Sequence, residues 1–327
     1  MKNNTTGSLN TANGVNSLSN NLTGNSNTAN GAYSLYYNNT GSDNTANGRY
    51  SLFSNTTGYS NTASGPSSLY SNTSGYINTA SGQSSLYSNT TGYLNTANGG
   101  ASLSQNTTGY NNSANGYQSL FSTTTGTSNT ANGARSLFSN TEGSNNTAIG
   151  YNANVSVGDL YNATAIGANA TVNASNKVRI VNASVTVIEG AVAWTNPSDR
   201  RLKENIKAND YLGLNFINKL QPVTYNYISD KTKVRHDGFI AQEIEQVMKD
   251  LNLHFSGLKK SPDGMYSLAY SDFVMPMVNA IKEQQSIISD LVKNSSDLAK
   301  KNDSYESQIL KLSSKLEEIE KRYPIGN

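Results

Sequence analysis

A serine and a lysine near the middle of the chain have residue types and a spacing that could support nucleophilic chemistry. Ser198 lies five positions before Lys203, with Arg200 and Arg201 between them. A serine hydroxyl attacks a carbonyl when a base accepts its proton, and a lysine is such a base only while its amine is neutral. Burial and neighbouring cations both favour the neutral amine. A simpler interpretation is also open, because Ser-Asp before a helical run is an ordinary N-cap.

Other residues that could carry chemistry are isolated. His236 and His254 lack companions at ligand spacing, so we expect no metal site and no cofactor. Within residues 1–150 the only carboxylates are Asp43 and Glu142, which lie far apart in sequence. A sugar-cleaving shaft is therefore not expected, because glycosidases need two carboxylates within about 10 Å or less.

Charge divides the chain into two unlike parts near Pro197. Residues 1–196 contain nine of the 46 charged side chains, and the remaining 37 follow. The first part has too few Lys and Arg to neutralise a row of phosphates, so we expect no nucleic-acid partner. No run approaches the roughly 18 to 20 apolar residues of a membrane span. The first residues lack the apolar core of a signal peptide, which predicts synthesis in the cytoplasm. The chain has no cysteine, and this excludes disulfides.

A repeat of seventeen residues fills the first part. Three residue types recur at this step without a slip in register. Glycine stands at 7, 24, 41, 58, 75, 92, 109, 126 and 143 and again at 14, 31, 48, 65, 82, 99, 116, 133 and 150, leucine at 18, 35, 52, 69, 86, 103, 120 and 137, and alanine at 12, 29, 46, 63, 80, 97, 114, 131 and 148. Such a period is typical of a solenoid.

The composition of each unit favours a β-solenoid. Gly, Asn, Ser and Thr weaken a helix interior, and the glycines separate short runs into strand, turn, strand, turn. Disorder is the main alternative for a polar repeat, but the strict Ala and Leu register argues against it. We expect Ala and Leu to point inward and Asn and Thr to form ladders between coils about 4.8 Å apart. One Leu and one Ala per coil make a thin core, so we expect three chains to share it.

The repeat changes over residues 147–196. The stretches Thr-Ala-Ile-Gly at 147–150 and 164–167 resemble the Ala-Ile-Gly repeats of the β-roll heads of trimeric autotransporter adhesins. Two strands are predicted after them, at 177–181 and at 185–188, with an Asn-Ala-Ser turn between them.

The segment from Pro197 resembles the intramolecular chaperone, or self-cleaving peptidase, domain at the C-terminus of phage tailspikes, tail fibres and endosialidases. Residues 238–245, Gly-Phe-Ile-Ala-Gln-Glu-Ile-Glu, match that family's second motif, which is expected to be helical. The resemblance implies a dyad of Ser198 and Lys203 that cuts the chain beside the serine. The scissile bond is then either Pro197-Ser198 or Ser198-Asp199, and Asp199 orients the turn or only caps it.

The C-terminal part has heptad periodicity. One series contains Met277, Gln284, Leu291, Leu298, Tyr305, Leu312 and Ile319, and the other contains Ile281, Ile288, Ser295, Asn302, Ile309 and Leu316. Alternating steps of four and three residues place both series on one stripe, as in the seam of a multi-stranded coiled coil. A single amphipathic helix packed on a globular domain is the alternative.

These observations predict a four-part chain. We expect a solenoid shaft at 1–146, an adhesin-head-like β-roll at 147–196, a small α+β chaperone and peptidase domain at 197–272, and a trimeric coiled coil at 273–323. The predicted function is a homotrimeric tail fibre or surface appendage whose C-terminal domain directs assembly and is then released. Its ligand would be a glycan or protein receptor on a host cell. One alternative is an adhesin that trimerises without cleavage, and another is an ice- or mineral-binding face made by Thr11, Thr28, Thr45, Thr62 and Thr79.

Overall fold

The structure is a computed structural model that describes residues 2–185, 187–192, 194–228, 230 and 232–322, and the chain forms two compact units. Strands β1 to β13 belong to the first, and the elements from the 3-10 helix η1 to α3 belong to the second. The elements are β1 (Thr11–Asn13), β2 (Thr28–Asn30), β3 (Thr45–Asn47), β4 (Thr62–Ser64), β5 (Thr79–Ser81), β6 (Thr96–Asn98), β7 (Ser113–Asn115), β8 (Thr130–Asn132), β9 (Thr147–Ile149), β10 (Asn154–Val155), β11 (Thr164–Ile166), β12 (Thr171–Val172), β13 (Val178–Ile180), η1 (Arg200–Leu202), α1 (Leu214–Lys219), β14 (Val223–Tyr225), β15 (His236–Gly238), α2 (Ala241–Asp250), β16 (Leu258–Lys260), β17 (Tyr266–Leu268), η2 (Tyr270–Phe273) and α3 (Val274–Arg322).

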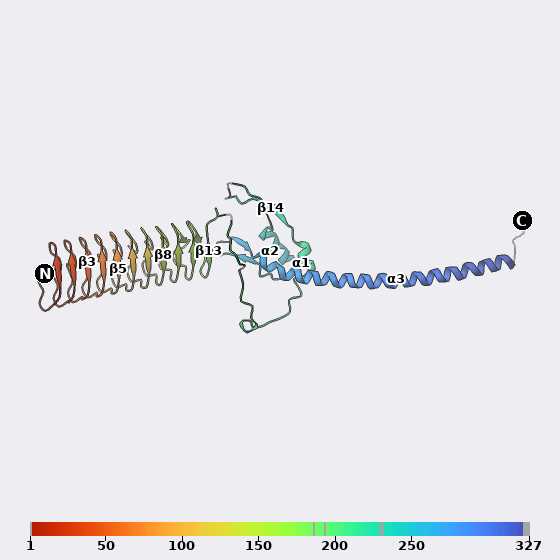
Figure 1. The fold of residues 1–327 in the computed structure, drawn as a ribbon, viewed down its shortest axis with the longest axis horizontal. Helices are drawn as coiled ribbons and strands as arrows, with labels where there is room; N and C mark the ends of the chain where they lie inside the picture. Colours follow the sequence, from red (N-terminus) through yellow and green to blue (C-terminus); the bar gives the residue numbers. More distant parts are fainter. Residues whose placement is uncertain (1, 186, 193, 229, 231, 323–327) are drawn as a thin grey trace. The chain divides into compact units, whose positions relative to one another are not determined.

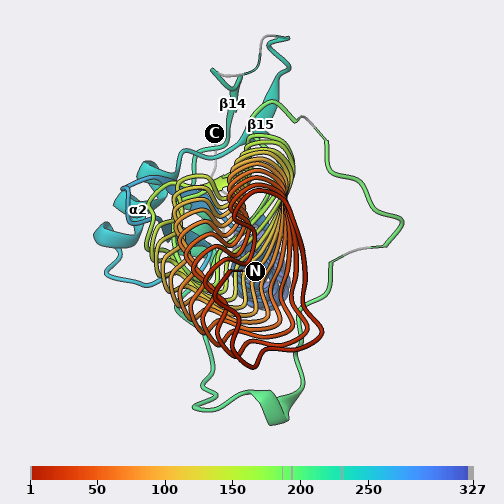
Figure 2. The same cartoon turned by 90° about the vertical axis from the view of Figure 1, so that its left-hand side faces the viewer.

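The first unit is a β-solenoid, as the repeat predicts. Each coil contributes one three-residue strand, and the strands stack in sequence order into a parallel sheet, β1 to β9 followed by β11 and β13. The register pairs equivalent positions, for example Ala29 with Ala46 and Thr28 with Thr45. Figure 1 shows the strands following one another along the unit, and Figure 2 looks down the stacked coils. The Thr column lies on the outer side of the sheet, because in strands such as β2 and β4 the central Ala is buried and the Thr before it is not.

The core of the solenoid closes within one chain. The leucines of the repeat and its strand alanines from Ala29 to Ala148 are 0% exposed. The expectation that three chains share this core is therefore corrected. The thin apolar column suffices because buried Asn and Ser side chains, fully hydrogen-bonded with one exception described below, fill the rest of each coil.

Two asparagine ladders run through the core, and one of them is interrupted at Thr123. Asn72 is typical: its Nδ2 donates to Asn55 Oδ1 at 2.7 Å and to the Gly75 carbonyl at 3.0 Å. Its own Oδ1 accepts from Asn89 Nδ2 at 2.7 Å. The glycines permit this stacking, since a Cβ on Gly75 would lie 2.3 Å from Asn72 Oδ1 and 2.4 Å from the Gly92 carbonyl oxygen.

The prediction of two strands per seventeen-residue coil is wrong. The run that contains each core leucine is a turn, and Leu69, for example, adopts the left-handed region with φ of 51°. The buried serine before it explains the turn, because Ser68 Oγ donates to the Gly65 carbonyl at 2.9 Å. The Leu69 amide then donates to the Ser85 carbonyl of the next coil at 3.0 Å, so the positive φ directs the side chain inward while keeping the inter-coil bond.

The solenoid continues through the residues where the repeat changes. Strands β9 and β11 extend the same sheet, while β10 and β12 form a second, two-stranded parallel sheet. The strand predicted at 177–181 is β13, which pairs parallel with β11. The second predicted strand, at 185–188, is not formed by residues 185, 187 and 188, and Thr186 lies outside the described residues.

The second unit has a small aromatic core beneath short elements. Its buried residues are Phe216 of α1, Phe273 of η2, Ile244 of α2, and Leu212 and Phe255 of the connecting segments. Two antiparallel hairpins, β14–β15 and β16–β17, complete it.

Helix α1 is capped from a residue distant in sequence. The Leu214 amide donates to Glu283 Oε2 of α3 at 2.9 Å. Gly213 permits this approach, because a Cβ there would lie 1.8 Å from Glu283 Oε1. The first turns of α3 are therefore part of the globular unit.

Helix α3 confirms the long helix predicted from the heptads. It has 49 residues, and its buried residues are Pro276 and Ala280. Beyond them both heptad series lie on the surface of the single chain. The last residue of the expected coil, at 323, lies outside the described residues. Within the described part of the chain, no helix combines the length and the apolar character needed to cross a membrane.

Candidate functional site

A single turn of 3-10 helix brings the predicted serine and lysine together. Asp199 occupies the N-cap of η1, and Lys203 occupies its C-cap, with the Lys203 amide donating to the Arg200 carbonyl at 3.1 Å. Both cap residues have extended backbone, so the chain enters and leaves the turn abruptly. As a result the side chains five positions apart meet: Lys203 Nζ donates to Ser198 Oγ at 2.6 Å.

Asp199 holds the turn in place through Arg201. Its Oδ1 accepts from the Arg201 amide at 2.9 Å, and the guanidinium forms two further hydrogen bonds to the carboxylate, of 3.0 and 2.7 Å. The side-chain hydrogen bond from Arg201, followed by the one from its amide, lowers the pKa of Asp199. The same pairing raises the pKa of Arg201. Asp199 thus both caps and orients the turn, and it balances one of the two cations expected to act on Lys203.

The geometry sets a condition on any chemistry at this pair. The lysine can accept the serine proton only as a neutral amine, because an ammonium has no lone pair. Both side chains are exposed in the single chain. A reactive state therefore needs the neutral amine, which removal from water would favour.

The second motif is only partly helical. Gly238 ends β15, Phe239 and Ile240 form a link, and α2 begins at Ala241. The prediction of a helix across the whole motif is therefore corrected for its first three residues. The link is held by a hydrogen bond from the Phe239 amide to Tyr270 Oη at 3.1 Å. The motif forms one wall of an aromatic cavity, which the sequence interpretation missed because its other walls come from elements before and after the motif in the chain.

Tyrosine stacks on the solenoid were also missed, although their signal was present. Tyr59, Tyr76, Tyr93 and Tyr110 follow the seventeen-residue step and stack with centroids 4.7 to 5.0 Å apart. Their ring faces cover one another, so the column presents mainly ring edges and hydroxyls.

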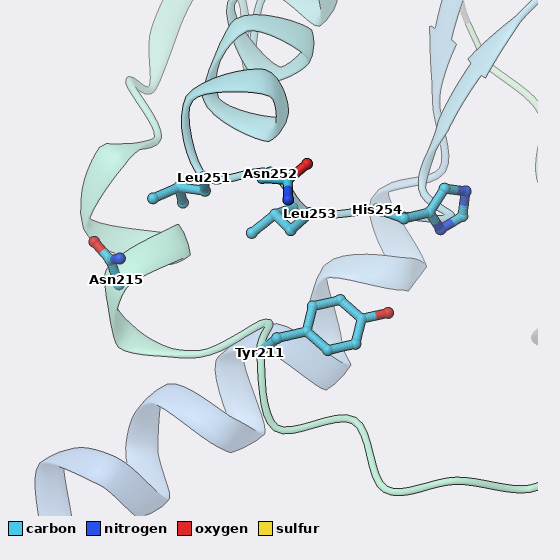
Figure 3. A pocket seen from close by; sticks show the side chains of 6 residues that line it. All are labelled: Tyr211, Asn215, Leu251, Asn252, Leu253 and His254. Atoms are coloured by element: carbon cyan, nitrogen blue, oxygen red, sulfur yellow. The ribbon is translucent and has the colours of Figure 1, made fainter.

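The two histidines lie apart. His236 stacks on Tyr225 with centroids 5.8 Å apart. His254 belongs to a cavity of about 280 Å³ beside Tyr211 and Asn215, and Figure 3 shows its imidazole directed away from the cavity centre. Among the residues that the structure describes, no three His, Cys, Asp or Glu side chains are grouped to hold a metal ion.

A comparison with known protein families found a match in this region. Residues 198–253 match the model of the family described as the chaperone of endosialidase. The match begins at Ser198 and includes Lys203 and the second motif. It supports an intramolecular chaperone domain, of a kind associated with trimerisation, after the solenoid. A comparison with curated proteins returned no match.

Proposed function

We propose that this chain is the subunit of a homotrimeric fibre whose C-terminal unit aligns three chains and is then released by self-cleavage beside Ser198. The observation that carries the proposal is the 2.6 Å hydrogen bond between Lys203 Nζ and Ser198 Oγ, at the first residues of the chaperone match. The fibre would be a virion tail fibre or another surface appendage. Its tip or shaft would contact a glycan or protein receptor.

Assembly is supported by the unpartnered stripe of α3. Leu291 is 60% exposed and Leu312 is 65% exposed, and the rest of both heptad series lies on the same stripe. A long helix in water is stabilised mainly by burying such a stripe. The polar Ser295 and Asn302 in the seam would fix its register. Three chains joined there would bring their solenoids to a high effective concentration with common ends.

The cleavage step follows from ring geometry. Attack of Ser198 Oγ on the Pro197 carbonyl carbon closes a five-membered ring, whereas attack on its own carbonyl would need a strained four-membered one. We therefore assign the cut to the Pro197-Ser198 bond. The neutral Lys203 amine accepts the hydroxyl proton and returns it to the Ser198 nitrogen as the C–N bond breaks. The resulting ester is hydrolysed by water, which leaves a carboxylate on Pro197 and restores the serine hydroxyl.

Trimer formation would control this step. The Ser198–Lys203 pair is exposed in the single chain, and partner chains that cover it would favour the neutral amine. Cleavage would then follow correct assembly. The released solenoids would lack the segment that aligned them, so their unfolding would be governed by kinetics rather than equilibrium.

The test uses the full chain and its Ser198→Ala and Lys203→Ala variants. Light scattering gives the oligomeric state, and intact-mass analysis gives the fragments. We expect a wild-type trimer with one cut that leaves Ser198 as the new N-terminus, and uncut trimers for both variants. Wild-type chains that trimerise and remain intact would refute the protease role. A new N-terminus at Asp199 would refute the assigned bond.

A second candidate function is an adhesin that trimerises without cleavage. It is favoured by the coils of β9 and β11, which carry the Thr-Ala-Ile-Gly stretches and extend the solenoid sheet without a break. Intact trimers of the wild-type chain are the result that this candidate predicts.

A further inference from the structure

An aromatic cavity of about 370 Å³ lies in the second unit, between β14, the start of α2, β17 and η2. Its aromatic lining consists of Tyr225, Tyr227, Phe239, Tyr266 and Tyr270. Figure 1 labels β14 and α2, two of the elements that form it. The volume is at the lower end of the range for binding cavities, about 300 to 1,000 Å³, which suits one bicyclic group better than an extended chain.

The walls of this cavity are fixed by hydrogen bonds and close packing of the lining residues. Tyr266 Oη donates to Glu245 at 2.8 Å and accepts from Lys260 Nζ at 2.7 Å. Tyr270 Oη accepts from the Phe239 amide. Gly238 is needed for this packing, because a Cβ there would lie 2.2 Å from Tyr270 Oη. The cavity is therefore formed before anything enters it.

The hydroxyls of Tyr225 and Tyr227 form a polar pair in the aromatic lining. They are 3.4 Å apart and share one hydrogen bond. This hydrogen bond, together with burial, raises the pKa of Tyr225 to about 12, so the hydroxyl is neutral at pH 7. The pair retains lone pairs and can accept a hydrogen bond from an incoming N–H group.

The only tryptophan of the chain is exposed elsewhere in the same unit. Trp194 is 86% exposed, and Val192 beside it is 84% exposed. Burial of an aromatic side chain of this size removes about 150 to 250 Å² from water, and a buried indole N–H needs an acceptor. Trp194 precedes Ser198 by four positions.

We propose that the indole of Trp194 from a second copy of this chain docks in the cavity lined by Tyr225, Tyr227, Phe239, Tyr266 and Tyr270. The ring has the size and the apolar faces that this lining accepts, and its N–H meets the Tyr225–Tyr227 hydroxyl pair. A second copy is the occupant because one chain alone leaves both the indole and the cavity open although they belong to the same unit.

This docking rests on the proposed trimer. It gives a function to the second motif of the chaperone domain, residues 238–245. Each subunit would grip the segment just before the scissile bond of a neighbour. Residues 239–242 of the motif would then serve as a wall of the receptor site for that segment.

The experiment uses the single tryptophan as a probe in the uncut Ser198→Ala chain, with selective excitation of the indole. In assembled trimers we expect emission shifted to the blue and acrylamide quenching reduced several-fold relative to the denatured chain. Tyr227→Ala, at a side chain 55% exposed, removes a wall and an acceptor and should restore quenching. Tyr211→Ala is the matched control, since Tyr211 is 53% exposed and lies outside the cavity.

Mixed trimers separate docking between chains from docking within a chain. Chains with Trp194→Phe have an intact cavity but no indole. Chains with Tyr227→Ala have an indole but a damaged cavity, so they supply every indole in the mixture. We expect mixing to restore part of the protection, because the indole of one chain can enter the cavity of the other. No recovery on mixing would overturn the second-copy assignment.

Failure of the docking and failure of the proposed function give different results. Trimers by light scattering whose indole remains fully quenched would overturn the docking and leave the trimer in place. Chains that remain monomeric would overturn both. Equal protection in Tyr227→Ala and wild type would show that the indole is buried elsewhere, which also refutes the proposal.

Discussion

A break in one asparagine ladder allows a sharp test of what stabilises the solenoid. The ladder passes through Asn72, Asn89 and Asn106, but the next coil has Thr123 at the equivalent position. A threonine hydroxyl cannot reach as far as an amide. Within the described part of the chain, Asn106 Oδ1 is the one buried side-chain polar atom without a hydrogen-bond partner.

The substitution Thr123→Asn should repair this break. The Asn72 side chain shows the intact arrangement. By analogy with it, the new amide would donate to Asn106 Oδ1 and to the Gly126 carbonyl, and it would accept from Asn140 Nδ2. It would replace the present 3.4 Å contact between Asn140 Nδ2 and the Thr123 hydroxyl. A buried acceptor without a partner costs about 1–3 kcal/mol. After the entropy of ordering the longer side chain, we expect a gain of about 1–2 kcal/mol.

The assay is local because a stack of coils need not unfold in one step. Hydrogen exchange of the amides between residues 103 and 126 reports opening of these coils in the full chain. A gain of about 1–2 kcal/mol slows exchange through opening by a factor of about 5 to 30.

Two controls bracket this result. Asn72→Thr copies the natural break into an intact rung and leaves Asn55 Oδ1 without its donor, so exchange around it should accelerate. Thr125→Asn makes the same chemical change at an exposed position of the repaired coil, where a change within about 0.5 kcal/mol is expected. If Thr123→Asn exchanges as fast as the wild type, the unpaired oxygen does not limit the stability of these coils.

Three further predictions concern other parts of the chain. Leu69→Ala empties a fully buried site and should lower the free energy of unfolding by about 2–5 kcal/mol, as measured by denaturant titration; a change within about 0.5 kcal/mol would contradict a closed single-chain core. Leu298→Ala, in the seam of α3, should weaken the trimer in light scattering, whereas Leu310→Ala, 70% exposed and outside both heptad series, should not. Hydrogen bonds from Arg201 lower the pKa of Asp199 below 3.8, so the Asp199–Arg201 pairing contributes stability above that value and loses it as the pH falls through the lowered pKa. The Arg201 Nε–H signal in the nuclear magnetic resonance spectrum of a nitrogen-labelled chain should therefore shift only in that acidic range.

Several features of the fold were determined by the sequence alone. The seventeen-residue register of Gly, Leu and Ala predicted the solenoid and its inward columns, because stacking of equivalent positions requires that period. The heptads predicted α3, because alternating steps of four and three residues form one stripe only on a helix. The pairing of Ser198 with Lys203 was implied by the family resemblance, and the 3-10 turn that brings them together was seen only in the structure.

Tertiary structure decided what depends on residues far apart in the chain. The Leu turns arise from inter-coil hydrogen bonds that a period does not reveal. The cap of α1 is the Glu283 carboxylate, which accepts a hydrogen bond from an amide 69 positions earlier in the chain. The aromatic cavity combines Tyr225 and Tyr270, whose separation carries no periodic signal. Local patterns determine repeating elements, whereas the contacts that close a core or a cavity depend on which elements pack together.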